Sequence, residues 1–252
     1  SDMIYAIICE ENEDYYKALK YYNKALSKDK FRADIMLRKI EILIGMDKIE
    51  EALENLDLFI QINPDLFEGY HLKFLILIEN NRLQEAQQIL QSAMAMFPED
   101  EGFLFDKVIL FEEQQKIQEA LEILETVFKN NNSKIVLNEK AKIYLSQNEV
   151  QKAKNTLKQI IDLNKDEFNE DSSFYLIMIY ISENDYLNAQ KYIDEIIEYK
   201  NEGIYYYSAL FLKGQVIKAL YGQNSCKDYY ENTVGILRQG SLDYPDNLDL
   251  II

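Results

Sequence analysis

A small residue returns at a nearly constant interval along this chain. The intervals are 34, 34, 34, 33 and 36 residues, and the residues that keep them are Ala18, Ala52, Ala86, Ala120, Ala153 and Ala189. A regular spacing of this length is typical of a chain built from stacked copies of one supersecondary unit. The period constrains the fold strongly, because each such unit buries its apolar face only against its neighbours.

Each alanine lies within the same apolar pattern. In the unit of Ala52, Ile49, Leu56 and Phe59 stand three residues before, four after and seven after the alanine, and the same offsets are apolar in the other units. This spacing places the side chains on one face of a helix. A second apolar pair, Ile40 and Leu43 in this unit, precedes the alanine by twelve and nine residues. Each unit is therefore predicted to be a helical hairpin.

Short polar stretches separate the predicted helices. Gly45-Met46-Asp47 is one such stretch inside a unit, and these residue types favour tight turns and helix caps. Between units, Asn63-Pro64-Asp65 and Phe97-Pro98-Glu99 place a proline twelve residues after the alanine. A proline ends one helix there, and an acidic residue suits the start of the next.

These segments resemble the tetratricopeptide (TPR) repeat. The stretches Gly45-Met46-Asp47-Lys48-Ile49-Glu50-Glu51-Ala52 and Asn81-Arg82-Leu83-Gln84-Glu85-Ala86, with their exit turns, look like its second helix, and the resemblance covers about residues 3 to 200. No unit has the family's tryptophan, and proline closes only two of the six units. The resemblance implies an all-α fold, a right-handed α-solenoid or superhelix of antiparallel helix pairs.

We expect a single array over residues 1–252. It would comprise about six clear repeats over 3–201, an irregular seventh over 202–243 and the start of an eighth at 244–252. In the seventh, 205–221 and 228–242 are the predicted helices, and Gln223-Asn224-Ser225-Cys226 is predicted to lengthen the turn between them. Because terminal repeats normally carry a polar capping face, the chain is interpreted as a fragment of a longer array.

Composition argues against several classes of partner and location. The net charge is −17, with 44 acidic and 27 basic residues and no basic block, whereas phosphate binding needs clustered Lys and Arg. The apolar runs are too short to span a membrane. The two cysteines, Cys9 and Cys226, form no disulfide framework. We therefore expect neither a nucleic-acid partner nor a membrane partner, and a cytoplasmic location. The sequence is equally compatible with a signal peptide or anchor that has been removed.

Catalytic signals are weak. His71 is the only histidine, and there is no Gly-rich phosphate loop and no Cys-x-x-Cys motif. Carboxylate pairs such as Glu112-Glu113 could serve a glycosidase, but sugar sites use aromatic platforms, tryptophan is absent, and the hairpin period does not fit a toroid. We expect no enzyme activity, no catalytic residue, no metal and no cofactor.

Four lysines form a ladder with the same period. Each stands thirteen residues before its alanine, and they are Lys39, Lys73, Lys107 and Lys140. They could form a basic stripe for an acidic ligand, or their aliphatic stems could pack against the neighbouring helix while the ammonium reaches solvent. We favour packing, with a nearby acid such as Glu41 or Asp106 neutralising each charge.

The resemblance also implies where a partner binds. TPR arrays usually bind peptides or helices in a concave groove lined by the first helix of each unit. Offsets of fifteen, eleven and eight residues before each alanine give the candidate partner-binding residues Leu37, Glu41, His71, Leu75, Ile78, Phe105, Ile109, Glu112, Asn138, Lys142, Phe174 and Met178. Most are apolar, and solvent-facing helix positions are normally polar unless something covers them.

The chaperone-adaptor TPR domains that clamp a C-terminal carboxylate use Lys, Asn and Arg at the first two of these offsets, and only Asn138 with Lys142 resembles part of such a clamp. The acids around the groove would repel a carboxylate terminus: Asp34, Glu68, Glu79, Glu112 and Asp171. The sequence thus predicts a non-catalytic protein-interaction scaffold whose apolar, acid-rimmed groove takes a peptide or amphipathic helix carrying Lys or Arg. The alternatives are a structural or self-associating region whose groove is filled by its own chain or a second copy, or an accessory region of a larger enzyme.

Overall fold

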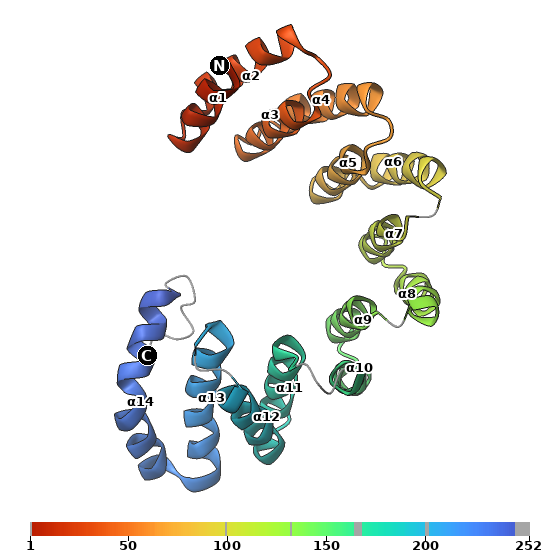
Figure 1. Cartoon of the computed structure of the whole chain (residues 1–252). Coiled ribbons are helices and arrows are strands. Elements are labelled where there is room, and N and C mark those ends of the chain that lie inside the picture. Colours follow the sequence, from red (N-terminus) through yellow and green to blue (C-terminus); the bar gives the residue numbers. More distant parts are fainter. Residues whose placement is uncertain (1, 99, 132, 164–167, 200–201, 245–252) are drawn as a thin grey trace. The chain divides into compact units, whose positions relative to one another are not determined.

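The structure, a computed structural model, is an all-α repeat fold. It describes residues 2–98, 100–131, 133–163, 168–199 and 202–244, and these contain fourteen helices and no strand. The helices, labelled in Figure 1, are α1 (Asp2–Glu11), α2 (Tyr15–Lys28), α3 (Ala33–Gly45), α4 (Ile49–Ile62), α5 (Phe67–Glu79), α6 (Leu83–Met96), α7 (Gly102–Glu113), α8 (Ile117–Asn131), α9 (Lys134–Ser146), α10 (Val150–Leu163), α11 (Glu170–Ser182), α12 (Tyr186–Tyr199), α13 (Ile204–Tyr221) and α14 (Gln223–Asp243).

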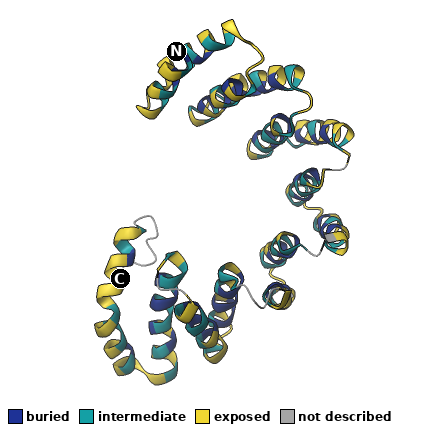
Figure 2. Ribbon diagram, viewed as in Figure 1, coloured by how far each residue is buried: buried dark blue, intermediate teal, exposed yellow. Residues whose placement is uncertain are grey.

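Two compact units make up the chain, Ser1–Ile123 and Leu124–Ile252, here called unit 1 and unit 2. In unit 1, α1 packs on α2, α3 on α4 and α5 on α6. Each hairpin also contacts the next one, through α2 with α3, α4 with α5 and α6 with α7. In unit 2, the hairpins are α9 with α10, α11 with α12 and α13 with α14. The buried faces lie between the packed helices, as the dark blue in Figure 2 shows.

The alanine period matches the burial pattern. All six alanines have 0% of their surface exposed. The apolar residues four positions after them are also buried: Tyr22, Leu56, Leu90, Leu124, Leu157 and Ile193. A second helix can approach its partner closely only where one side chain is this small, because interiors are packed at crystal-like density. The predicted register is therefore confirmed.

The turns inside the first six hairpins share one backbone feature, a single non-glycine residue with a positive φ angle. In each of the first six pairs, the residue five positions before the alanine has φ between 56° and 60°, and none is glycine: Glu13, Asp47, Asn81, Gln115, Asn148 and Asn184. At Asp47, the backbone N–H donates to the Ile44 carbonyl, and the next N–H, of Lys48, donates to the Leu43 carbonyl, both at 2.9 Å. These two bonds close the helix end in a Schellman motif.

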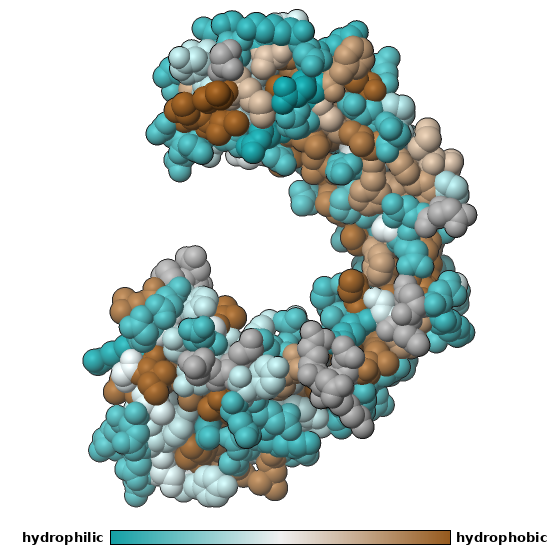
Figure 3. Space-filling model, viewed as in Figure 1, coloured by the Kyte–Doolittle hydropathy of each residue, from teal (hydrophilic) through white to brown (hydrophobic). Residues whose placement is uncertain are grey.

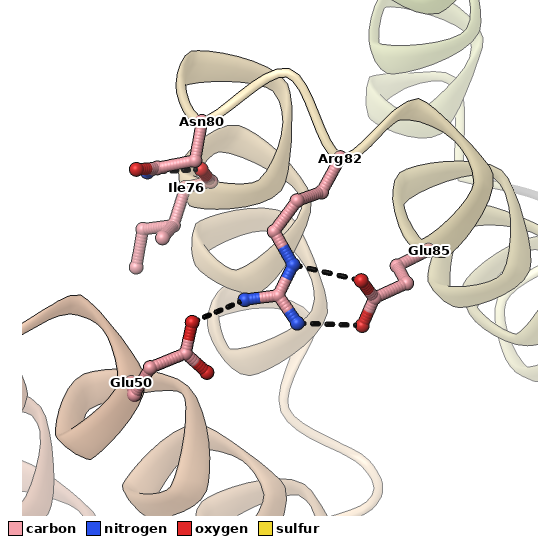
Figure 4. A network of polar contacts seen from close by, with 5 residues as sticks. All are labelled: Glu50, Ile76, Asn80, Arg82 and Glu85. Atoms are coloured by element: carbon pink, nitrogen blue, oxygen red, sulfur yellow. Dashed lines mark hydrogen bonds and ion pairs between the residues drawn. The ribbon is translucent and has the colours of Figure 1, made fainter.

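Unit 1 also contains a polar link between repeats, drawn in Figure 4. Arg82, at the turn into α6, donates from Nη1 to Glu50 on α4 at 2.8 Å and binds both carboxylate oxygens of Glu85. The hydrogen bonds that Arg82 donates to Glu85 are the main cause of the raised pKa of Arg82. The arginine thus joins two successive second helices, α4 and α6, by charge-assisted bonds of defined geometry.

The seventh hairpin differs from the predicted one in its turn. Gln223-Asn224-Ser225-Cys226 was expected to lengthen that turn, but these residues form the first turn of α14. The connection is a single residue, Gly222, with φ of 90°, a value that glycine adopts without strain. The expected lengthening is therefore wrong. α13 and α14 are instead longer than the other helices, with 18 and 21 residues.

Most of the expected start of an eighth repeat at 244–252 lies outside the described residues, which end at Tyr244. Within the described ranges, no helix is both long enough and apolar enough to cross a bilayer.

Candidate interaction surface

In unit 1, the candidate residues lie on one side of the first helices α3, α5 and α7. The apolar ones are partly exposed although they pack against the core at their base: Leu37, Leu75, Ile78 and Ile109. Phe105 is also partly exposed, and Glu41 on α3 is exposed. We call this set, with His71 and Glu112, the unit-1 surface. Its apolar side chains therefore keep part of their surface exposed on the folded chain.

His71 and Asp106 join two helices of this surface. The Nδ1 atom of His71 on α5 lies 2.9 Å from both carboxylate oxygens of Asp106 on α7. The Asp106 side chain is 1% exposed and that of His71 37%. The Phe67 ring stacks on the imidazole, with ring centroids 5.2 Å apart. Hydrogen bonding to Asp106 raises the pKa of His71, although burial opposes the shift.

We expect this pair to make stability depend on pH. Because the folded-state pKa of His71 is raised above its ordinary 6.5, the contribution is fully present below pH 6.5 and is lost as pH rises through the folded pKa. The imidazole is partly exposed, so solvent screening limits the contribution to about 0.5–1 kcal/mol. Thermal melts at pH 6 and pH 9 should show a larger loss for the wild type than for His71→Gln. Equal losses would contradict the role of the pair.

In unit 2, two candidate residues border one hollow. A cavity of about 280 Å³ opens between α9 and α11, over a floor of Ala141 and Leu157. Asn138, Lys142 and Leu145 line it from α9, and Asp171 and Tyr175 from α11, together with Ile135. Phe174 and Met178 do not line this cavity; they lie on α11, where Met178 is exposed and Phe174 packs at a tilt against Tyr205. We call the residues that line this cavity, together with Phe174 and Met178, the unit-2 surface.

The sequence analysis did not predict two of the residues that line the hollow. Ile135 and Tyr175 are exposed large hydrophobic side chains at its rim. Their positions, eighteen and fourteen residues before an alanine, are not among the offsets that the family resemblance supplies. The available signal was an apolar side chain on an exposed helix position.

The charges near the two surfaces are mostly acidic. Glu68 and Glu79 on α5 are exposed and have no ion pair within the described residues of unit 1, whereas Asp34 pairs with Arg32. In unit 2, Asp171 accepts a hydrogen bond from the Tyr205 hydroxyl, and Lys142 pairs with Glu139 at 2.8 Å. The Asn138 and Lys142 pair, which resembles part of a carboxylate clamp, therefore has two carboxylates as neighbours.

The four ladder lysines are partly buried, as favoured, and two of them pair with acids other than those expected. Lys73 pairs with Asp57, and Lys140 pairs with Glu125 at 2.6 Å, so the acid comes from the preceding second helix. Asp106, expected to neutralise its neighbour Lys107, pairs with His71 instead. The reason is geometric: in a helix, consecutive residues point in directions about 100° apart.

Hydrophilic residues cover much of the molecular face seen in Figure 3, with hydrophobic residues interspersed among them. No group of three or more His, Cys, Asp and Glu side chains that could hold a metal ion is found among the residues the structure describes. The arrangement offers apolar contact and charge for another molecule.

Comparison with family models gives two matches. A model described as tetratricopeptide repeat matches residues 77–134, and a second with the same description matches residues 136–167. No curated protein sequence matches the chain.

Several solved structures share the fold. A tetratricopeptide repeat protein from Parabacteroides merdae superposes with a TM-score of 0.59 at 12% identity, covering 93% of this chain and 91% of its own. PilW, a type IV pilus biogenesis factor, gives 0.57 at 17% identity over 83% and 96% of the two chains. PilF of Pseudomonas aeruginosa gives 0.55 at 16% identity over 87% and 97%. At such identities these likenesses concern the fold alone.

Proposed function

The chain belongs to the tetratricopeptide-repeat family, and on that premise we propose that it is a non-catalytic scaffold that binds a peptide or an amphipathic helix through its first helices. The family match supports protein interaction in general. The observation that carries the finer proposal is the row of partly exposed apolar side chains on α3, α5 and α7, because a contiguous apolar patch on a protein surface often marks an interaction site.

The chemistry of the partner follows from the neighbouring charges. Glu68 and Glu79 are available to a cation, and the chain as a whole carries a net charge of −17. A ligand with apolar anchors flanked by Lys or Arg would fill the apolar positions and be steered by the acids. The cytoplasm is the location we propose, since both cysteines are free.

The test replaces two anchors of the unit-1 surface together. Partners captured by the wild type and identified by mass spectrometry should bind the Phe105→Gln, Leu75→Gln double variant at least about tenfold more weakly, because central apolar contacts carry most binding energy. A matched control, Tyr16→Gln with Met96→Gln, removes two exposed apolar side chains from second helices and should bind like the wild type. Affinities can be measured by fluorescence anisotropy, with circular dichroism to check the helix content.

The acids are tested separately. Changing Glu68, Glu79 and Glu112 to Gln should slow association and weaken its salt dependence, with little effect on dissociation. If the double variant keeps its helix content and still binds the same partners with wild-type affinity, the unit-1 surface is not the binding site.

A further inference from the structure

A second hollow lies away from the residues used above. It has a volume of about 520 Å³ in unit 1, between the second helices α2 and α4 and over α3. It is lined by Asn23, Leu26, Lys30, Phe31, Met36, Lys39, Asn55, Leu58, Gln61 and Ile62. Ligand pockets for small molecules span roughly 300–1,000 Å³, so this hollow has a suitable size.

The lining is unusual for so acidic a chain. Acidic residues outnumber basic ones by 44 to 27 overall, yet the hollow is lined by two lysines, three side-chain amides, five apolar residues and no carboxylate. Two of the apolar side chains, Phe31 and Leu58, are 65% and 47% exposed. An apolar wall next to cationic and amide groups suits a molecule with an apolar body and an anionic end.

The repeat register shows why one of these lysines lacks an acid. Lys73, one period after Lys39, pairs with Asp57, and the residue one period before Asp57 is Asn23. The ladder position of the first hairpin thus has an amide where the next one has a carboxylate. Lys39 has no ion-pair partner in the described part of unit 1.

The acid that acts on Lys39 is engaged elsewhere. Glu51 attracts the ammonium from a distance, but its carboxylate pairs with Lys48 at 2.7 Å. Burial lowers the pKa of Lys39, so its charge is costly to hold without a counter-ion. A partly buried ammonium with no carboxylate of its own is a ready partner for the carboxylate of a ligand.

We propose that this hollow binds a small amphiphilic carboxylate, whose apolar body lies against Phe31, Leu58 and Ile62 and whose carboxylate pairs with Lys39. The amide of Asn23 can donate to the same carboxylate, as can the second N–H of Asn55, whose Nδ2 also donates to the Glu51 carbonyl at 2.6 Å. Lys30 adds positive charge to the lining. The carboxylate of the ligand would thus pair with Lys39 as Asp57 pairs with Lys73. This site is independent of the unit-1 and unit-2 surfaces.

The probe is decanoate, titrated below its micellar concentration into isotope-labelled protein and followed by NMR. We expect saturable shifts of the resonances of residues lining the hollow. Decanol, which has the same chain without the charge, should bind at least about tenfold more weakly, because it offers Lys39 no counter-ion.

The decisive variant restores the carboxylate found in the next repeat. Asn23→Asp should fold, pair with Lys39 and weaken decanoate binding at least about tenfold, since the ligand must then compete with an internal acid. The matched control is Gln91→Glu, which puts a carboxylate at the same register position next to the Lys107 repeat, outside the hollow, and should bind like the wild type.

Three results would overturn the proposal. They are the absence of saturable shifts, equal binding of decanoate and decanol, and equal binding by Asn23→Asp and the wild type with native circular dichroism. None of these bears on the capture experiment with Phe105 and Leu75, so the two proposals fail separately.

Discussion

Ala86→Leu is expected to unfold at a lower temperature than the wild type. Ala86 is 0% exposed on α6, in the core that α5 and α6 share with Phe74 and Leu90. A leucine adds three carbons where no space is left, which forces side chains off their rotamers or the helices apart. Overpacking of this kind costs about 1–3 kcal/mol, or more where the backbone cannot move.

The control for this variant lies on the same helix. Ala95 is exposed near the end of α6, so Ala95→Leu adds the same atoms without entering the core. Because alanine and leucine have similar helix propensities, this variant should melt within about 0.5 kcal/mol of the wild type. Melts followed by far-ultraviolet circular dichroism compare the three proteins, and an unchanged midpoint for Ala86→Leu would contradict the tight crossing.

The sequence was sufficient to predict the first six hairpins because one spacing fixes several things at once. In the unit of Ala52, the offsets place Leu56 and Phe59 on the buried face, and the polar stretch that ends at Asp47 marks the turn, where the structure shows Asp47 with a φ of 58°. Each repeat contacts only its neighbours, so local pattern and tertiary packing agree. The same reasoning placed the lysine stems between helices.

The seventh hairpin could not be predicted in the same way, because its packing does not follow the alanine rule. The polar residues 223–226 are typical of a turn, yet they begin α14. Two tyrosines further along this helix, Tyr229 and Tyr230, donate hydroxyl hydrogen bonds to the carbonyls of Leu210 and Phe211 on α13. These contacts between distant residues outweigh the local turn propensity, and no periodic pattern in the sequence predicts them.

The candidate surfaces were predictable only in part. Offsets from the alanines predict which positions of a first helix keep some exposure, and Leu75 on α5 and Phe105 on α7 are partly exposed. They do not predict which residue an ionisable side chain reaches, as the pairing of His71 with Asp106 shows. Cavities depend on the sizes of several side chains at once. The α9–α11 hollow therefore became visible only in three dimensions.

Two glycines in the last hairpin should respond oppositely to the same substitution. Replacing glycine by alanine inside a helix normally stabilises it by about 0.5–1 kcal/mol. Gly235 on α14 has no neighbouring atom within 4 Å of an added Cβ, so Gly235→Ala should raise the melting temperature. A Cβ on the buried Gly214 of α13 would instead lie 2.1 Å from Cζ of Tyr230, far inside van der Waals contact.

Gly214→Ala should therefore destabilise by about 1–3 kcal/mol, because the Tyr230 ring must move. That movement breaks the 2.8 Å hydrogen bond from its hydroxyl to the Phe211 carbonyl and disturbs its edge-to-face contact with Tyr229. A double-mutant cycle with Tyr230→Ala isolates the clash, since Gly214→Ala should cost much less when the ring is absent. If Gly214→Ala and Gly235→Ala change the melting temperature in the same direction, α13 and α14 do not pack through this tyrosine and glycine contact.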